Sequence, residues 1–257
     1  MTSKKHLIVA SLGTLALLGA GCGAAPETPA PAPSAPAPSA ETQNPAPAPA
    51  AAEEAPVVRA AEPPTAPEGA KAIADGGYMV AANSKVTWEG RKPLISGYAD
   101  KGTLDVKEGS ATVKDGKITE GTVVIDMKTL KATAMAKAGA EAMLEKHLMG
   151  ADFFDVEKFP MATLKITSVE PAADASTTFR YTVKGDLTMK EKTNPIEFPA
   201  TIYAGTDGKL HAAAKLDLNR AKWDVRFGSD TFFDNLANNV IDDYFTLSFD
   251  IAGDMKK

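Results

Sequence analysis

The amino-acid sequence predicts a mainly β protein, folded as an antiparallel eight-stranded barrel with one helix between strands. From residue 71 on, apolar and polar side chains alternate with a period of two over most of the length, which is typical of strands with one buried face. Short turn signals separate these runs, and one Pro-free segment with a helical pattern interrupts them. Short connections favour antiparallel neighbours, and one-sided alternation suits a barrel or sandwich better than a parallel sheet covered by helices.

The strands are expected where the alternation is regular. In the clearest run, Tyr181, Val183 and Leu187 fall on one face, while Lys184 and Asp186 fall on the other. Turn signals at 114–117, 174–176 and 206–208 separate neighbouring runs. We expect these nine runs to make about eight strands; they lie at residues 80–90, 97–106, 109–113, 121–127, 162–169, 179–190, 196–202, 210–218 and 245–251.

One helix is expected at residues 132–150, which lack Pro and are rich in Ala, Lys, Met and Glu. Met143, Leu144, His147 and Leu148 would share one face of this helix. Gly150 is expected to end it, because glycine commonly stops helices, and the chain would then return to the sheet.

The first residues have the layout of an export signal. Lys4 and Lys5 precede an uncharged run over residues 7–20. This run has about 14 residues, whereas a membrane-spanning helix needs about 20. We therefore expect residues 1–21 to be a signal peptide that is removed, rather than a permanent membrane helix.

The only Cys lies at the expected cleavage point. Ala20, Gly21 and Cys22 resemble the bacterial lipoprotein signal, in which the Cys is diacylated and becomes the new N-terminus, although Gly19 stands where that signal usually has Leu. The resemblance implies that Cys22 is a lipid anchor and that the protein is an exported, membrane-anchored lipoprotein of the bacterial cell envelope, in the periplasm or on the outer surface. Two or more acyl chains give stable membrane attachment. An ordinary secretory signal with a chance thiol is the alternative.

Behind Cys22, residues 22–70 are expected to be a disordered Pro/Ala-rich linker, and residues 71–257 the barrel domain. Thirteen of the 18 Pro lie between Gly23 and Gly69. Val57 and Val58 are the only branched aliphatic residues in this stretch, so it cannot bury enough apolar surface to fold. Alternating Ala-Pro favours an extended, semi-rigid spacer.

Composition and motifs exclude several functions. The formal net charge is −5, and much of it comes from the linker, so the nearly neutral barrel domain argues against nucleic acid as a partner. With one Cys and three His, the chain has too few of the side chains that form structural zinc sites, so we expect no such site. No Gly-rich phosphate loop, nucleophile-elbow Ser or His-Glu-x-x-His motif occurs. His6, His147 and His211 are scattered, and we expect no catalytic residue, no metal and no cofactor.

The interior of the expected barrel is the remaining candidate site. An eight-stranded barrel is either filled by its own side chains or holds one slender ligand. Small residues at expected inward positions, Gly185, Ala200, Ala212 and Ala214, would leave room. A barrel filled by Phe and Met side chains is the alternative, and an interior below about 300 Å³ would favour it. The candidate cavity residues are Val86, Trp88, Leu144, Phe153, Phe154, Phe179, Tyr181, Val183, Leu187, Phe198, Ala212, Ala214, Phe245 and Phe249.

Three segments resemble the YceI-like family of lipid- or polyisoprenoid-binding proteins. The first is His147-Leu148 followed by residues 152–160, Asp-Phe-Phe-Asp-Val-Glu-Lys-Phe-Pro. The second is the Gly-Asp-Leu-Thr run at 185–188 with the turn after it, although Glu191 stands where the family commonly has Gly. The third spans residues 218–243, with Arg220, Trp223 and a 232–235 insertion that only some members have.

The resemblance implies a lipocalin-like barrel without catalytic residues, often dimeric, whose apolar cavity holds a long lipid. It implies non-enzymatic binding of a polyisoprenoid or isoprenoid quinone, for carriage or storage in the cell envelope, with the membrane as a second partner through the N-terminal lipid. Arg220, Asn235, Asn238 and Asn239 would be candidates for contacts with a headgroup, or else ordinary loop residues. The alternative function is a structural or interaction lipoprotein with a side-chain-filled barrel.

Overall fold

The computed structural model describes residues 56–81, 84–173 and 179–256, so the expected signal peptide, Cys22 and most of the expected linker lie outside the described residues. Within those ranges no helix has the length and hydrophobicity that crossing a membrane requires. The elements are β1 (Val58–Ala60), β2 (Gly76–Val80), β3 (Lys85–Arg91), β4 (Ala99–Lys114), β5 (Lys117–Ala134), α1 (Glu141–Met149), β6 (Met161–Pro171), β7 (Arg180–Met189), β8 (Lys192–Ala204), β9 (Leu210–Asn219), the 3₁₀ turns η1 (Arg220–Trp223) and η2 (Ala237–Asn239), and β10 (Tyr244–Met255).

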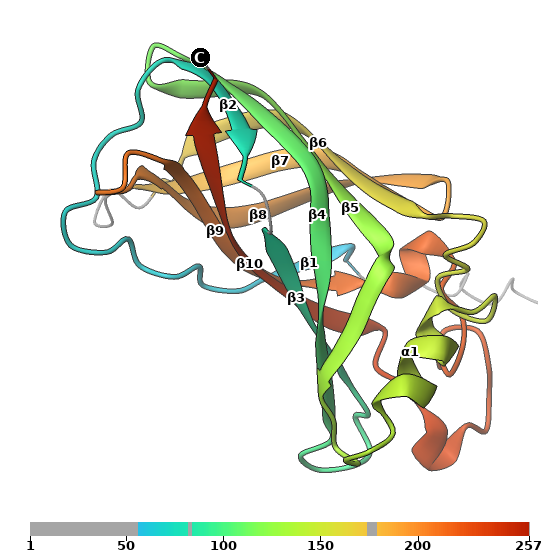
Figure 1. The fold of residues 1–257 in the computed structure, drawn as a ribbon. Helices are drawn as coiled ribbons and strands as arrows, with labels where there is room; N and C mark the ends of the chain where they lie inside the picture. The colour runs from blue at the N-terminus through green and yellow to red at the C-terminus, as the bar shows by residue number, and fades with distance from the viewer. Residues whose placement is uncertain (1–55, 82–83, 174–178, 257) are drawn as a thin grey trace, which may run out of the picture. The chain divides into compact units, whose positions relative to one another are not determined.

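Strand β10 closes the sheet into a barrel (Figure 1). One edge of β10 pairs with β9, from Tyr244 opposite Asn219 to Gly253 opposite Leu210. The other edge pairs with β3 and then with β2, which lie end to end between β10 and β4. From β4 to β9 the strands follow in sequence order as antiparallel neighbours. Because β2 and β3 together fill one position, the expected antiparallel eight-stranded barrel with one helix is confirmed.

The alternation in the sequence identifies the inward faces correctly along most strands. On β7, for example, Val183, Leu187 and Met189 are buried as expected. The expected strands 97–106 and 109–113 are a single strand, β4, with a register irregularity between Val106 and Glu108. The extra residue there shifts the buried positions from even numbers to odd ones, so one long strand looks like two in the sequence.

The expected helix 132–150 is wrong at its start. Residues 132–134 belong to β5, where Ala132 and Ala134 pair with Gly102 and Lys101 of β4. Pairing with a neighbouring strand overrides the helical propensity of Ala and Lys. Only Glu141–Met149 forms the helix, and it ends at Gly150. Met143 is 76% exposed and so does not share the buried face with Leu148.

Strand β5 bends sharply near its middle (Figure 1). Thr103 and Asp105 of β4 lie opposite Lys131 and Asp126, so the residues between these two on β5 form an irregular bulge. The Thr129 hydroxyl holds the bulge, because it accepts a hydrogen bond from the Asp105 N–H and donates one to the Asp126 carbonyl. The bulge leaves Met127 and Leu130 buried in the interior.

The chain lies against the barrel earlier than the expected linker boundary at residue 70. Strand β1 pairs with residues 216–218 of β9, beyond the part of β9 that β8 covers. The Tyr244 hydroxyl donates to the Pro56 carbonyl, and the Arg59 guanidinium lies 3.5 Å from the centre of the Tyr244 ring. The described part of the expected linker therefore covers an exposed strand edge.

The turn between β7 and β8 has two residues, Lys190 and Glu191, with φ of 49° and 60°. Positive φ at both positions is the geometry of a type I′ hairpin turn, which favours Gly at the second position. Glu191 thus occupies a left-handed conformation that costs a residue with a Cβ about 1 kcal/mol. The YceI-like family that the sequence resembles commonly has Gly at this position.

We expect Glu191→Gly to stabilise the protein by on the order of 0.5–1 kcal/mol, because Gly adopts this conformation without strain. The melting temperature, measured by differential scanning calorimetry, should rise by roughly 1–4 °C. Glu197→Gly on the extended strand β8 is the control and should lower it. A melting temperature of Glu191→Gly at or below that of the unchanged protein would contradict the strain argument.

Candidate functional site

The barrel is not filled by its own side chains. Two cavities of about 280 Å³ and about 130 Å³ lie within the described residues. Ile125, Leu187, Leu218 and Leu247 line both of them, so the two cavities are neighbouring compartments of the barrel interior on either side of this ring. Each compartment alone falls below the roughly 300 Å³ limit expected for a filled barrel, and only their combined volume exceeds it.

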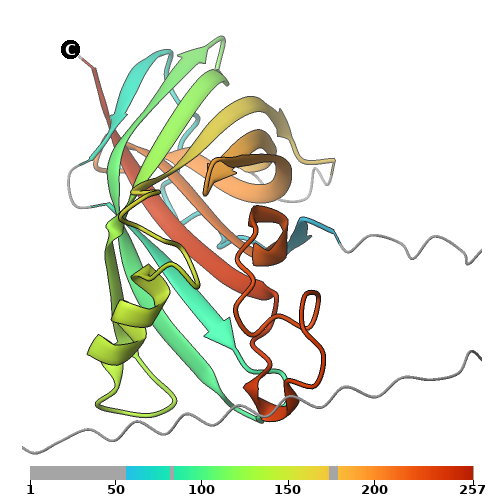
Figure 2. The same ribbon diagram turned by 90° about the vertical axis from the view of Figure 1, so that its right-hand side faces the viewer.

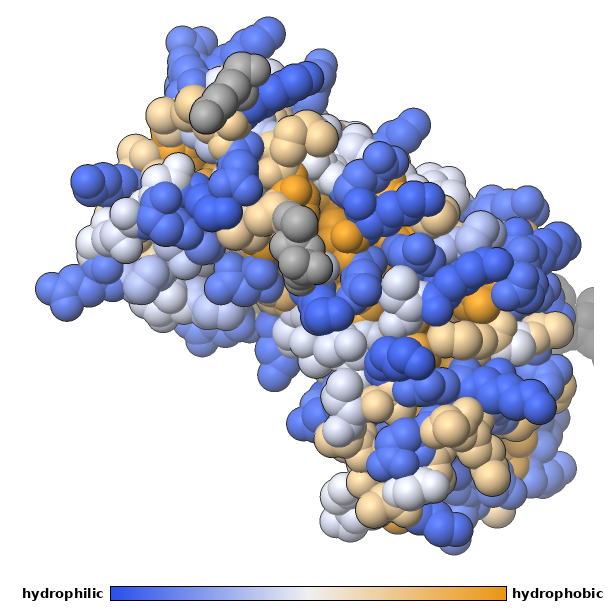
Figure 3. Space-filling view, in the orientation of Figure 1, coloured by the Kyte–Doolittle hydropathy of each residue, from blue (hydrophilic) through white to orange (hydrophobic). Residues whose placement is uncertain are grey.

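The compartments exist because several inward positions carry small side chains. Ala162, Ala200 and Ala212 line the compartments with a single methyl group each. On β10, Phe245 and Phe249 point inward and pack against the core, yet they are only partly buried because each also faces the hollow. In the space-filling view, hydrophobic surface shows between the hydrophilic side chains (Figure 3).

The smaller compartment is almost entirely apolar. Among the described residues that line it, none carries a charge, and Val183, Ile196, Phe198 and Leu216 are typical of them. Apart from the hydroxyls of Tyr78 and Ser110, this surface has no side-chain group that could orient a polar ligand, so it suits a hydrocarbon chain.

The larger compartment is apolar beside the smaller one and polar at its far end. Arg91, Lys92, Tyr98, Asp100 and Asp242 line this far end. The residues come from the β3–β4 connection and from the loop before β10, and α1 contributes Leu144 and His147. Both compartments are partly open to solvent, and we call the polar end of the larger one the mouth.

An aromatic cluster forms one wall of the mouth. The His147 ring meets the Phe153 ring edge-on, with 5.1 Å between centroids, and the Phe227 ring at 4.5 Å. Phe154 lies beside Phe153, with ring centroids 6.2 Å apart. The Lys190 ammonium donates to the Phe153 carbonyl, and its burial lowers its pKa. This bond ties the wall to the β7–β8 turn.

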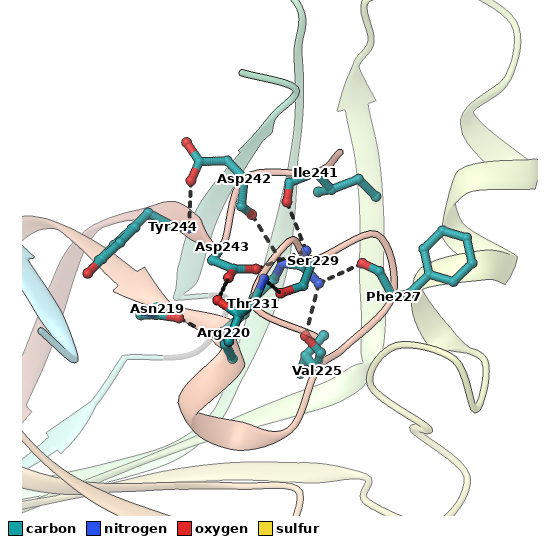
Figure 4. Close-up of polar contacts among 11 residues, drawn as sticks. Asn219, Arg220, Val225, Phe227, Ser229, Thr231, Ile241, Asp242, Asp243 and Tyr244 are labelled. Atoms are coloured by element: carbon teal, nitrogen blue, oxygen red, sulfur yellow. Dashed lines mark hydrogen bonds and ion pairs between the residues drawn. The ribbon is translucent and has the colours of Figure 1, made fainter. Parts of the chain in front are cut away.

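A buried guanidinium positions the loop before β10 (Figure 4). Arg220 Nε donates to the Asp242 carbonyl, Nη1 to the carbonyls of Val225 and Phe227, and Nη2 to the Ile241 carbonyl. Nη2 also lies 3.3 Å from Asp243 Oδ1. Burial lowers the pKa of Arg220, and the Asp243 carboxylate opposes this effect. The contacts hold Phe227 and Ile241 where they line the mouth.

Arg220 holds the loop in place, which is the ordinary loop role that the sequence left open beside a headgroup contact. Four N–H groups of the guanidinium donate to the four carbonyls, and Nη2 also forms an ion pair with Asp243. Asn235, Asn238 and Asn239 line neither compartment. The sequence singled out these residues by type, whereas access to the cavity depends on how the loop folds.

Most of the candidate cavity residues lie where the sequence placed them. The larger compartment is lined by Trp88, Leu144, Phe153, Phe154, Leu187 and Phe245, and the smaller one by Val86, Val183, Leu187, Phe198, Ala212 and Phe249. Phe179, Tyr181 and Ala214 line neither compartment. Phe179 precedes β7 with a φ of 67°, and Ala214 is fully enclosed by neighbouring residues.

Sequence reasoning missed several lining residues. Ile125 and Leu247 belong to the ring between the compartments, and Leu164 and Ile166 line the smaller one. All four lie on predicted strands. The alternation that assigns the inward face of each strand could therefore have identified them as lining residues. Met127 and Leu130 depend on the β5 bulge, which the period of two does not reveal.

The mouth is surrounded by exposed hydrophobic side chains. Most of the large exposed ones among the described residues come from the β3–β4 connection, α1 and the loop before β10, namely Leu94, Ile95, Met143, Phe227, Phe232 and Phe233. Figures 1 and 2 both show these segments at the same end of the barrel. Exposed apolar side chains gathered at one place mark an interaction site more often than scattered ones do.

Comparison with known proteins agrees with this architecture. The model of the YceI-like domain matches residues 78–252. A UPF0312 protein of Pseudomonas putida is 29% identical over 162 residues, which cover 58% of this chain and 80% of that protein. The crystal structure of Burkholderia cenocepacia BcnA is 20% identical, with a TM-score of 0.50 over 66% of this chain and 95% of that chain. The likeness to BcnA shows the fold and nothing about a ligand.

A further solved structure is that of a polyisoprenoid binding domain from Saccharophagus degradans, implicated in plant cell wall breakdown. It is 15% identical, with a TM-score of 0.49 over 71% of this chain and 100% of that chain.

One side of the larger compartment depends on the close approach of Trp88 to Gly102. A Cβ atom at position 102 would lie 2.4 Å from the Trp88 indole and 1.8 Å from the Lys131 carbonyl oxygen. We expect Gly102→Ala to destabilise the protein by about 1–3 kcal/mol, because neither backbone nor ring can give way without distorting the wall.

Chemical denaturation would measure this change in the free energy of unfolding. Gly90→Ala is the matched control, since Gly90 lines the same compartment and a Cβ there has no heavy atom within 4 Å. Equal stabilities of the two variants would show that Gly102 is not needed for the Trp88 packing.

Proposed function

The chain belongs to the YceI-like family, and on this premise we propose that its barrel binds one long apolar lipid, without enzymatic activity, for carriage or storage in the cell envelope. The observation that carries the proposal is the unfilled apolar interior, whose two compartments lie on either side of the ring of Ile125, Leu187, Leu218 and Leu247. An elongated chain that passes this ring would bury its surface against both linings. Removal of apolar surface from water supplies the binding free energy.

A polyisoprenoid or an isoprenoid quinone suits this interior. Its methyl-branched chain is slender enough for an eight-stranded barrel, and the charge-free smaller compartment would accept its tail. Apolar contacts discriminate weakly for each methylene added or removed, so we expect several chain lengths to bind. The alternative, a structural or interaction lipoprotein with a filled barrel, requires an interior without these compartments.

We propose that the protein acts at a membrane. Lipidation of Cys22 would anchor it in the cell envelope, and the Pro-rich segment behind Cys22 would give the barrel reach. The exposed hydrophobic side chains around the mouth, such as Leu94, Met143 and Phe233, support exchange of the ligand with a lipid phase. Assembly into a homodimer would be compatible with such a role.

Native mass spectrometry of the full-length protein, purified in mild detergent from a bacterial envelope, tests the proposal. We expect a bound species whose organic extract contains a prenyl lipid or a quinone. Protein that carries no lipid and takes up none when polyprenyl lipids or quinones are added, while it remains folded, would contradict lipid binding.

Filling the smaller compartment should weaken lipid binding. Ala212 of β9 is partly buried and lines this compartment. We expect Ala212→Phe to lower affinity for a long prenyl lipid by about tenfold or more, because the added ring occupies the space of the tail. Equilibrium binding of a fluorescent prenyl probe would measure it.

Lys215→Phe is the matched control, because it adds the same ring on the outward face of the same strand. The control should bind like the unchanged protein. Unchanged affinity in Ala212→Phe would mean that the ligand does not reach the smaller compartment.

A further inference from the structure

The ionisable side chains that line the larger compartment differ in one respect, namely whether they have a partner. Arg91 donates through Nε to Glu89 Oε1 at 2.9 Å and through Nη2 to Thr246 Oγ1 at 2.7 Å. Asp100 is buried and accepts a hydrogen bond from the Ala136 N–H at 3.0 Å. These two charges are therefore already engaged within the protein.

Three more of these side chains are engaged as well. The Tyr98 hydroxyl bonds to Asp100, and burial together with this bond raises the pKa of Tyr98. Asp242 Oδ1 accepts a hydrogen bond from the Tyr244 N–H at 2.9 Å. Arg220 donates to four carbonyls and forms an ion pair with Asp243.

Two ionisable side chains in the lining remain, Lys92 and His147, and neither side chain forms a hydrogen bond or an ion pair with any described residue. The Lys92 ammonium lies 5.3 Å from the centre of the Tyr98 ring, which offers no acceptor atom. The His147 ring is held edge-on against Phe153 and Phe227, so neighbours fix its position without using its nitrogens. Trp88 Nε1 also lacks a partner, but it is fully enclosed and therefore does not face the cavity.

Building on the proposed lipid binding, we propose that Lys92 and His147 hold an oxygen-bearing headgroup at the mouth, with the hydrocarbon tail directed into the smaller compartment. An ammonium has three N–H donors and an imidazole has at least one, so together they suit carbonyl, hydroxyl or phosphate oxygens. Hydrogen bonds from a charged donor are about twice as strong as neutral ones. The ligand is therefore a lipid with an oxygen headgroup rather than a plain hydrocarbon.

The distribution of charge gives the orientation. The charged lining residues lie at the mouth, whereas no described residue that lines the smaller compartment carries a charge. In the smaller compartment a headgroup would find only the hydroxyls of Tyr78 and Ser110 and no charged donor, so the mouth is the more favourable place for it. The tail therefore enters first and the headgroup stays beside α1 and the β3–β4 connection.

The test compares ligands that differ in their oxygen atoms, using the full-length protein in detergent. The probes are phytane, which is an isoprenoid hydrocarbon, geranylgeraniol, geranylgeranyl monophosphate and decylubiquinone. We expect the unchanged protein to bind oxygen-bearing probes at least about tenfold more tightly than phytane, because a hydrogen bond to a charged group adds this much discrimination. The three oxygen-bearing probes then distinguish alcohol, phosphate and quinone headgroups.

The variant Lys92→Met keeps most of the side-chain length and removes the donor, and Lys92→Arg restores a charged donor. We expect Lys92→Met to weaken binding of the oxygen-bearing probes about tenfold and to leave binding of phytane unchanged. Lys92→Arg should restore binding of the oxygen-bearing probes. His147→Leu, which keeps an apolar contact with Phe153 and Phe227, should act in the same direction. Lys146→Met on the exposed side of α1 is the control and should change nothing.

The outcomes separate this proposal from the proposed function. Equal binding of phytane and the oxygen-bearing probes, or Lys92→Met and His147→Leu variants that bind all probes like the unchanged protein, would overturn the headgroup site and leave lipid binding intact. A protein that binds none of the four probes would contradict lipid binding itself.

Discussion

The structure depends on the pairing of both edges of β10. One edge meets β9 and the other meets β3 and β2, so a single strand converts a twisted sheet into a closed barrel. A closed barrel has no free edge along this seam, and its interior is separated from water by backbone hydrogen bonds all the way round. The inward residues Phe245, Leu247 and Phe249 belong to this strand, so the same pairing that closes the barrel also sets the wall of both compartments.

The mouth depends on a second interaction, the buried Arg220 with Asp243. Taking both charges out of water is costly, and it is offset only where every donor finds an acceptor. Here the carbonyls of Val225, Phe227 and Ile241 supply those acceptors, so the loop before β10 must adopt the one path that brings them together. The guanidinium thereby positions the Phe227 ring against His147. Loss of one partner would leave a buried charge unpaired and release the loop that shapes the mouth.

Alternation in the sequence was enough to predict the antiparallel barrel and the inward faces of β7 and β8, because a period of two is a direct result of strand geometry. It could not predict features that arise from contacts between distant segments. Residues 132–134 look helical but pair with β4, and the bulge of β5 that buries Leu130 is held by a bond from Asp105. Val57 and Val58, the only branched aliphatic residues of the expected linker, were the available signal that this segment meets the barrel.

The size of the interior was likewise beyond the sequence, because it depends on how facing side chains meet across the barrel. Ala212 was identified as small, yet whether a large neighbour fills the space beside it follows only from the fold. An apolar cavity that stays empty forfeits contacts on the order of 24 cal/mol for each Å³. The hollow interior therefore lowers stability compared with a filled barrel. A lipid that fills both compartments would restore these contacts, and so binding and stability should increase together.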